Sequence, residues 1–239
     1  MIFSVWGGVM MMSMSLLADA DLVELSEIDP TIKQSPRYAT NENFTGKKVD
    51  GYNVKKIVIK RKAALKLKQV QEYLQKYGYT LVIYDAYRPK RAVKNFVRWS
   101  KNKDISTKKR YYPTLDKSVL FEKGYICETS SHCKGYTADL TIMQLGKPLQ
   151  EVNIKERTLK NKEKISFLDD GTVDMGTSFD CFHEASQHNS DLVNEVAQKN
   201  RKFLEDTMHK FGFTTIKEEW WHYTLEDTDS SEDYDIPIE

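Results

Sequence analysis

The sequence has little cysteine and lacks any CxxC pair. Its 239 residues include three cysteines, Cys127, Cys133 and Cys181, which are too few and too widely spaced for a disulfide scaffold. Without a CxxC pair, neither a thiolate zinc knuckle nor a thioredoxin-type redox pair is expected. A cysteine nucleophile at Cys133, beside His132, stays open as an alternative. It is a minor one, because neighbours in sequence rarely form a catalytic dyad.

Long apolar runs and low-complexity segments are also missing. With 40% hydrophobic and 30% charged residues, the composition is typical of a soluble globular protein. It excludes a collagen-like chain, extended disorder and a multi-span membrane protein. A chain of 239 residues forms one large domain or two small ones, and it can bury enough surface to fold without disulfides or metal.

The chain has almost no net charge overall, but two of its segments are strongly charged. The formal net charge is +1, whereas Thr45 to Arg110 has 20 Lys/Arg against 4 Asp/Glu, and Asn200 to Glu239 has 4 against 11. Such asymmetry can mark a polyanion-binding face. We favour solvated faces that complement each other in the fold, and we expect no nucleic-acid partner.

The first twenty residues differ from the rest of the chain. Met1 to Leu17 contains no charged side chain, and Ala18-Asp19-Ala20 resembles a small-x-small cleavage site. This layout predicts a signal peptide over residues 1–20, too short for a membrane span, and therefore a periplasmic or otherwise exported protein without stable membrane association once processed. The pattern departs from the rule in lacking an N-terminal Lys or Arg, so a cytoplasmic chain is the alternative.

Hydrophobic periodicity predicts helices and strands in irregular alternation. Steps of three and four predict a helix over 61–77, a β-branched apolar run predicts a buried strand over 79–84, and Pro89 begins a further helix. Alternation predicts a strand over 136–143, with its even-numbered residues on one face.

The C-terminal half continues this pattern. We expect a helix over 192–211 with Val196 in its apolar stripe, one strand over about 213–225, a surface insertion over about 150–170, and an acidic tail over 226–239 that frays. The irregular spacing predicts a single α+β domain over residues 21–239, with a mixed, largely antiparallel sheet flanked by helices.

Two short stretches combine imidazole and carboxylate groups. They are Ser130 to Asp139 and Glu218 to Tyr223. Catalytic zinc takes three N/O ligands and keeps an open position, which His132, Asp139 and His222 could provide, although His132 and Asp139 could instead merely cap a strand. Glu219, three residues before His222, would share its side only on a helical turn or across a β-bulge, and could then act as a general base. The other three histidines are predicted to be structural or solvated.

Several stretches in the right order carry a resemblance to a known family. They are Arg37 to Gly46, Tyr84 to Arg91, Ser130 to Thr141, Phe179-Asp180 and Glu219 to Thr224. On these residues the chain resembles the VanX-type D-alanyl-D-alanine dipeptidases, zinc enzymes with the Hedgehog/DD-peptidase-like fold. The resemblance runs from about Asp21 to Pro237.

The resemblance implies a role for each matching residue of the reaction centre. His132, Asp139 and His222 would bind one Zn²⁺ per chain. Glu219 would be the catalytic base, and Arg88 would stabilise the tetrahedral oxyanion.

Three further residues would bind the charged ends of the substrate, the dipeptide D-Ala-D-Ala. Ser130 matches the group that binds the carboxylate, while Asp180 and Tyr38 match the ammonium subsite. The chain departs from the family at Thr137, where Ala is usual, and Cys133 follows the first ligand. The hydroxyl of Thr137 is expected near Asp139.

The sequence therefore predicts zinc-dependent hydrolysis of D-Ala-D-Ala to two D-alanines, in cell-wall recycling or glycopeptide resistance. A D,D-carboxypeptidase or endopeptidase of the same fold, acting on longer wall peptides, is the first alternative. A non-catalytic module that binds an anionic polymer through the segment Thr45 to Arg110 is the remote one. The sequence predicts no oligomeric state.

Overall fold

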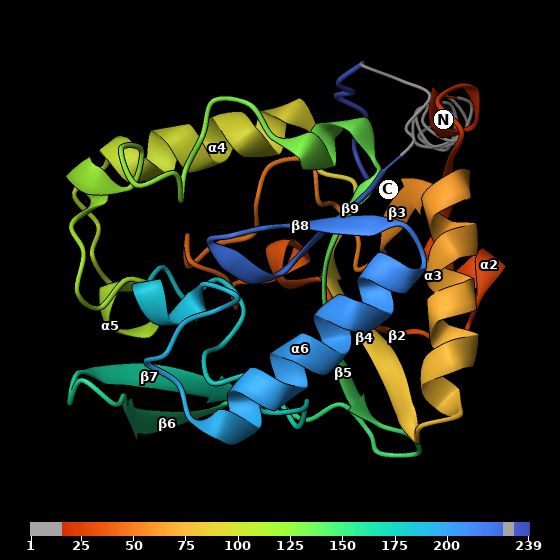
Figure 1. Cartoon of the computed structure of the whole chain (residues 1–239). Coiled ribbons are helices and arrows are strands. Elements are labelled where there is room, and N and C mark those ends of the chain that lie inside the picture. Colours follow the sequence, from red (N-terminus) through yellow and green to blue (C-terminus); the bar gives the residue numbers. More distant parts are fainter. Residues whose placement is uncertain (1–15, 227–231) are drawn as a thin grey trace.

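A computed structural model describes residues 16–226 and 232–239 (Figure 1). Its main sheet has five strands in the order β2-β4-β5-β9-β8. These are β2 (Lys33–Gln34), β4 (Tyr79–Asp85), β5 (Thr137–Gln144), β9 (Glu219–Leu225) and β8 (Phe213–Ile216). Only the β2–β4 pair is parallel. The predicted α+β class with a mixed, largely antiparallel sheet is confirmed.

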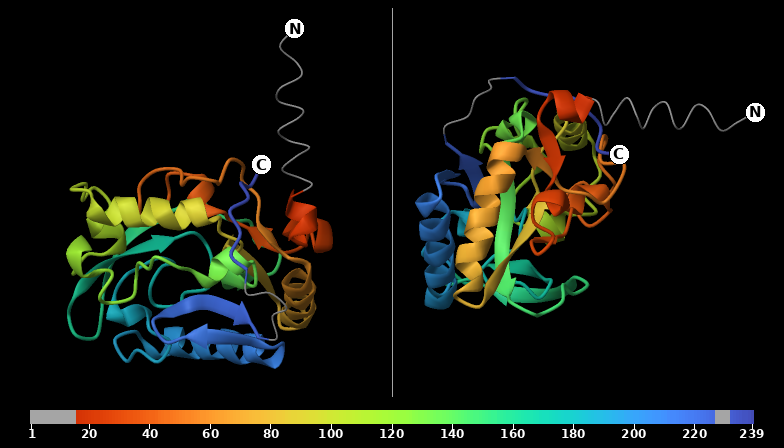
Figure 2. Two further views of the ribbon diagram at one scale, coloured as in Figure 1. Left: turned by 90° about the horizontal axis from the view of Figure 1, so that it is seen from above. Right: turned by 90° about the vertical axis from the view of Figure 1, so that its right-hand side faces the viewer.

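Long helices cover both faces of this sheet. α3 (Arg61–Gln75) and α6 (Glu195–Lys210) lie on one face, and α4 (Lys90–Lys101) lies beyond the other (Figure 2). The apolar stripe of α3 is fully buried as predicted, but the helix ends before Tyr77, which is exposed. Gly78 turns the chain with φ +78°, and β4 follows at once.

Smaller elements surround the main sheet. β1 (Leu22–Glu24) pairs with β3 (Val58–Lys60), and β6 (Asn153–Thr158) pairs with β7 (Lys164–Asp169). The short helices are α2 (Leu25–Ile28), α5 (Lys108–Tyr111), η1 (Arg37–Ala39), η2 (Lys117–Val119), η3 (Ser131–Lys134) and η4 (Glu184–Ser186).

The structure corrects two expectations for the C-terminal half. The single strand predicted over 213–225 is the hairpin β8–β9. The 150–170 segment, predicted as a surface insertion, contains the mostly exposed or half-buried hairpin β6–β7, although Ile165 is buried. Val196 is 64% exposed, because α6 begins only at Glu195, after the N-cap Asn194, so Val193 and Val196 do not share one helical stripe.

The prediction that the acidic tail frays is wrong for residues 232–239. Ile236 and Ile238 are buried, and Ile238 exchanges backbone hydrogen bonds with Gly51 and Asn53. Tyr87 donates to the Ile236 carbonyl and accepts from the Ile236 amide. This end of the chain therefore holds the segment that carries Arg88.

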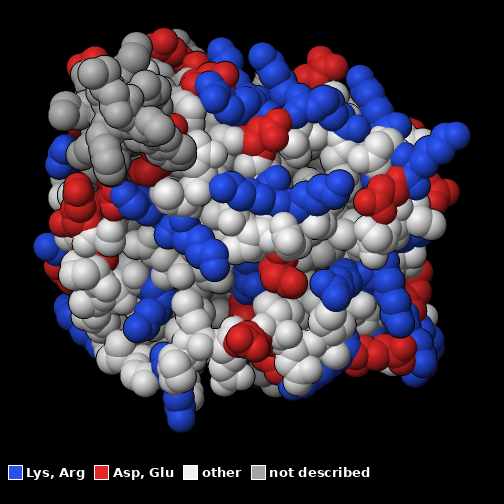
Figure 3. Space-filling view, turned by 180° about the vertical axis from the view of Figure 1, so that it is seen from behind, with Lys and Arg blue, Asp and Glu red and all other residues white. Residues whose placement is uncertain are grey.

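Oppositely charged segments meet in the fold, as the charge pattern predicted. Asp235 of the acidic segment binds Arg91 of the basic segment at 2.9 Å. On the face seen in Figure 3, basic side chains are interspersed with acidic ones and with uncharged surface.

The predicted signal peptide lies mostly outside the described residues. Of its last five residues, which the structure includes, Ala20 is buried, and its carbonyl accepts a hydrogen bond from the buried Lys60 ammonium. Within residues 16–226 and 232–239, no helix is long and apolar enough to span a bilayer.

Candidate active site

A row of polar side chains crosses three neighbouring strands. Asp85 at the end of β4 pairs with Asp139 of β5, and Asp139 pairs in turn with His222 of β9. Directly opposed residues on antiparallel strands point to the same face. Strand register therefore brings two carboxylates and one imidazole together from positions far apart in the sequence.

His132 joins this row from the loop before β5. It lies in η3, which Gly135 ends with φ +79°, and a Cβ at Gly135 would lie 2.7 Å from Leu22 Cδ2. Glycine alone allows both this backbone conformation and this close approach. The His132 Nδ1–H donates to the Ala86 carbonyl at 2.7 Å, so the lone pair of Nε2 faces Asp139 and His222.

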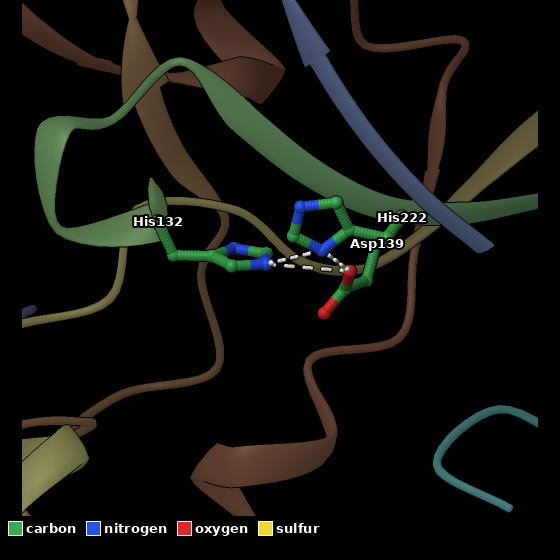
Figure 4. A group of neighbouring side chains, drawn as sticks. All are labelled: His132, Asp139 and His222. Atoms are coloured by element: carbon green, nitrogen blue, oxygen red, sulfur yellow. Dashed lines mark hydrogen bonds and ion pairs between the residues drawn. The ribbon is translucent and has the colours of Figure 1, made fainter. Parts of the chain in front are cut away.

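The three groups form a triangle of ligand atoms (Figure 4). His132 Nε2, His222 Nδ1 and Asp139 Oδ1 are separated by 3.3 Å on each side. Tetrahedral zinc with bonds of ~2.0–2.1 Å needs ligand atoms about 3.3 Å apart. Asp139 Oδ1 is buried and accepts no hydrogen bond, which suits an atom that binds a cation. This donor set therefore fits a zinc ion.

Ionisation of His132 and Asp139 also suits a cation, whereas burial lowers the pKa of His222 but Asp139 and Glu219 raise it overall. Burial and the nearby Arg88 lower the pKa of His132, which favours its neutral, ligating form. Burial alone would raise the pKa of Asp139, but the two imidazoles hold it well below its usual range, so the carboxylate is charged.

Hydroxyl groups contact the outer nitrogen of His222. Ser131 Oγ lies 3.3 Å and Thr224 Oγ1 3.4 Å from Nε2. Thr137, opposite Thr224 in the sheet, binds the Thr224 hydroxyl at 2.9 Å. Thr137 shares a face of β5 with Asp139, as expected, and its hydroxyl reaches His222 through Thr224.

Glu219 lies beside His222 because the β8–β9 pairing is irregular. Thr215 pairs with Tyr223, yet the next residue, Ile216, pairs with Glu219, so β9 carries extra residues at this point. The irregularity places Glu219 Oε2 3.6 Å from His222 Nδ1, on the side that a regular strand would forbid. Burial raises the pKa of Glu219 to about 7, against the opposing effect of His222. A carboxyl with this pKa can exchange protons at neutral pH.

Arg88 is held over the site by a carboxylate that the sequence analysis did not assign. Asp85 Oδ2 binds Nη2 of Arg88 at 2.8 Å and Nε at 3.0 Å, and Asp85 Oδ1 accepts from Tyr52 at 2.7 Å. The guanidinium also lies over the rings of Tyr38 and Phe96, each centroid 5.2 Å away. The sequence signal for this carboxylate was the position of Asp85, three residues before Arg88 in the stretch Tyr84 to Arg91.

The remaining predicted residues complete one cavity. Tyr38 donates to the Asp180 carboxylate at 3.0 Å, and Arg88 Nη1 lies 3.5 Å from Ser130 Oγ. The cavity has a volume of about 200 Å³, and Phe44 and Phe96 supply apolar wall. All eight predicted site residues line it: Tyr38, Arg88, Ser130, His132, Asp139, Asp180, Glu219 and His222.

Other chemically active side chains lie apart from this group. Cys133 is buried, and burial raises the pKa of its thiol to about 11, which disfavours a reactive thiolate. His183 is buried and caps η4, accepting from the Ala185 amide at 3.0 Å. His188 is buried as well.

Comparison with known proteins places the chain in a family. A family model described as D-ala-D-ala dipeptidase matches residues 18–153 and 158–237, so within the 150–170 segment only residues 154–157 fall outside it. A D-alanyl-D-alanine dipeptidase of Enterococcus faecalis is 37% identical over 205 residues, covering 85% of this chain and 90% of the relative. One of Enterococcus faecium is 36% identical, covering 90% and 96%. One of Escherichia coli is 30% identical, covering 86% and 84%. The chain therefore belongs to the D-Ala-D-Ala dipeptidase family and is a metallopeptidase.

Proposed function

We propose that this protein is a zinc-dependent dipeptidase that hydrolyses D-alanyl-D-alanine to two D-alanines. The observation that carries the proposal is the convergence of the metal-binding triangle, Glu219 and Arg88 on one cavity of about 200 Å³. A volume of this size suits a free dipeptide better than a longer peptide chain. His132, Asp139 and His222 would hold the metal.

A bound zinc ion would supply a Lewis acid that polarises the scissile carbonyl and acidifies water. Glu219 takes the proton from the attacking water and then donates it to the leaving amine, a role that its raised pKa supports. Arg88 donates hydrogen bonds to the negative charge that develops on the carbonyl oxygen. Because Asp85 and the rings of Tyr38 and Phe96 fix the guanidinium beforehand, little reorganisation accompanies the reaction.

Selectivity for a free dipeptide follows from the two ends of the cavity, each of which pairs with one charged end of the substrate. The buried Asp180 carboxylate pairs with the substrate ammonium, with Tyr38 holding that carboxylate, and Ser130 binds the substrate carboxylate. An N-acylated substrate lacks the ammonium and leaves Asp180 without its partner, which costs binding free energy. Comparable rates on a pentapeptide and on free D-Ala-D-Ala would instead favour the carboxypeptidase alternative.

The decisive experiment separates metal binding from catalysis. Glu219→Gln should keep about one zinc per chain and lose ~10²–10⁴-fold in kcat on D-Ala-D-Ala. His132→Ala should lose both zinc and activity. Lys202→Met, on the exposed surface of α6, is the control and should match the wild type in both. Retained turnover in Glu219→Gln would refute the assigned mechanism.

We also propose that the protein is exported and serves recycling of wall peptides in the periplasm, as residues 1–20 suggest. In the cytoplasm the same activity would deplete the precursor of glycopeptide-sensitive cell wall. Cleavage after Ala18-Asp19-Ala20 would leave Asp21 at the mature N-terminus and would remove the carbonyl that the buried Lys60 binds in the uncleaved chain. The intact mass of protein from the periplasmic fraction tests this, and an unprocessed cytoplasmic chain would contradict export.

A further inference from the structure

We propose that Arg201, on the far side of the sheet from the cavity, positions Asp180 and so sets the selectivity for a free substrate ammonium. This inference rests on the proposed function, in which Asp180 pairs with that ammonium. Arg201 touches neither the cavity nor Asp180 and is therefore a positioning residue. It acts through the loop over residues 175–187, on which Asp180 lies.

Arg201 binds both ends of this loop from the middle of α6. Its Nε donates to the Met175 carbonyl at 2.7 Å and its Nη1 to the Gln187 carbonyl at 2.6 Å. Its Nη2 donates to the Ala185 carbonyl at 2.8 Å and lies 3.4 Å from the Thr177 hydroxyl. One planar guanidinium thus closes a loop whose ends are twelve residues apart along the chain.

Arg201 is a deeply buried cation. The residue is 1% exposed, and its hydrogen-bond acceptors are carbonyls and a hydroxyl. Burial lowers its pKa to about 9, which still leaves the guanidinium charged at neutral pH. Burying a charge without a carboxylate partner is costly, so the loop must supply enough acceptors to offset that cost.

A chain of hydroxyl groups extends from Arg201 toward Asp180. Thr177 Oγ1 lies 2.9 Å from Ser186 Oγ, and Ser186 donates to the Cys181 carbonyl at 2.6 Å, one residue after Asp180. Thr177 Oγ1 also accepts from the indole N–H of Trp220 at 2.9 Å. The same network therefore touches the neighbours of both Asp180 and Glu219.

Asp180 itself needs such support. Its φ is +60°, a left-handed conformation that is strained for a residue other than glycine, and its side chain is buried. Tyr38 donates a hydrogen bond to the carboxylate at 3.0 Å. Without the loop network, relaxation of this backbone would move the carboxylate away from the ammonium position.

The test compares substrates with and without an ammonium group. Hydrolysis of D-Ala-D-Ala and of N-acetyl-D-Ala-D-Ala is measured for the wild type, Arg201→Lys, Ser186→Ala, Asp180→Asn and the surface control Lys202→Met, together with zinc content. A lysine ammonium carries its three donors on one atom, so it cannot reach carbonyls that Arg201 binds from three separate nitrogens. Arg201→Lys should therefore raise KM for D-Ala-D-Ala ~10-fold or more with a smaller change in kcat.

The deciding quantity is selectivity, defined as kcat/KM for D-Ala-D-Ala divided by kcat/KM for N-acetyl-D-Ala-D-Ala. In Arg201→Lys it should fall toward that of Asp180→Asn, with zinc content unchanged, and Ser186→Ala should shift it less in the same direction. Equal losses on both substrates would overturn the inference. Where Arg201→Lys does not fold, an unchanged ratio in Ser186→Ala overturns it. An unchanged ratio in Asp180→Asn would overturn the proposed ammonium subsite and this inference with it.

Discussion

Asp85→Asn tests whether Arg88 acts in catalysis only because a buried carboxylate fixes it. Asp85 is 1% exposed and binds two nitrogens of Arg88, while Tyr52 donates to its other oxygen. The amide keeps the size of the side chain but removes its charge. Arg88 is then left with the carboxylate of Asp139, 3.4 Å from Nη2, as its remaining acidic partner.

The expected loss follows from these contacts. A charge-assisted hydrogen bond contributes ~1.5–3 kcal/mol, which corresponds to about a 10–100-fold fall in kcat/KM if Arg88 moves out of position. Tyr52→Phe removes one hydrogen bond from Asp85 but leaves its charge, so it should cost ~1 kcal/mol or less and reduce kcat/KM by less than tenfold. Both variants should bind zinc, because Asp85 is not one of the three ligand groups.

The assay is kcat/KM on D-Ala-D-Ala with the thermal midpoint as a check on folding. In a double-mutant cycle, Arg88→Lys should cost much less in the Asp85→Asn background than in the wild type, because the two side chains act as one unit. Additive losses, or a kcat/KM for Asp85→Asn within twofold of the wild type, would refute the reasoning.

Three further predictions concern stability. Gly135→Ala should lower the free energy of unfolding by ~2–4 kcal/mol, measured by urea titration, because the residue has φ +79° and its Cβ would meet Leu22; equal midpoints would contradict this. Burial lowers the pKa of His188 to about 4. The neutral side chain therefore makes its full contribution to the free energy of unfolding above pH ~6.5, and up to about 3 kcal/mol of that free energy is lost as the pH falls from there toward 4. His188→Gln should therefore show a shallower acid dependence of stability, and parallel profiles would count against the prediction. Removal of the metal by a chelator should lower the thermal midpoint of the wild type but not of His132→Ala. Where free metal had been 1,000-fold above its Kd, the free energy of unfolding should fall by ~4 kcal/mol.

Periodicity predicted the elements that bury one continuous apolar surface. The stripe of α3 was visible because it keeps one period along its whole length, and β4 was visible as an uninterrupted, largely apolar run. β6 and β7 were invisible, because most of their residues are exposed or half-buried and do not alternate cleanly. The β8–β9 turn was also missed, since no glycine or proline marks it.

The sequence predicted those parts of the site that depend on residue type alone. It did not predict the parts that depend on the register in which the strands pair. His132, Asp139 and His222 were chosen by their chemistry and their order along the chain. The position of Asp85 in the same row depends on the pairing of β4 with β5, which spacing does not reveal. The placement of Glu219 beside His222 needed a local irregularity whose existence the sequence left open.

The position of β9 determines when during synthesis this protein can become active. It is the last strand among the described residues, yet it lies between β5 and β8, and it carries His222 and Glu219. Until it leaves the ribosome, β5 has an open edge and a largely apolar surface, which is an aggregation hazard for a stalled or truncated chain. The proposed metal-binding triangle cannot close earlier, so a nascent chain cannot hydrolyse a substrate before β9 has been translated.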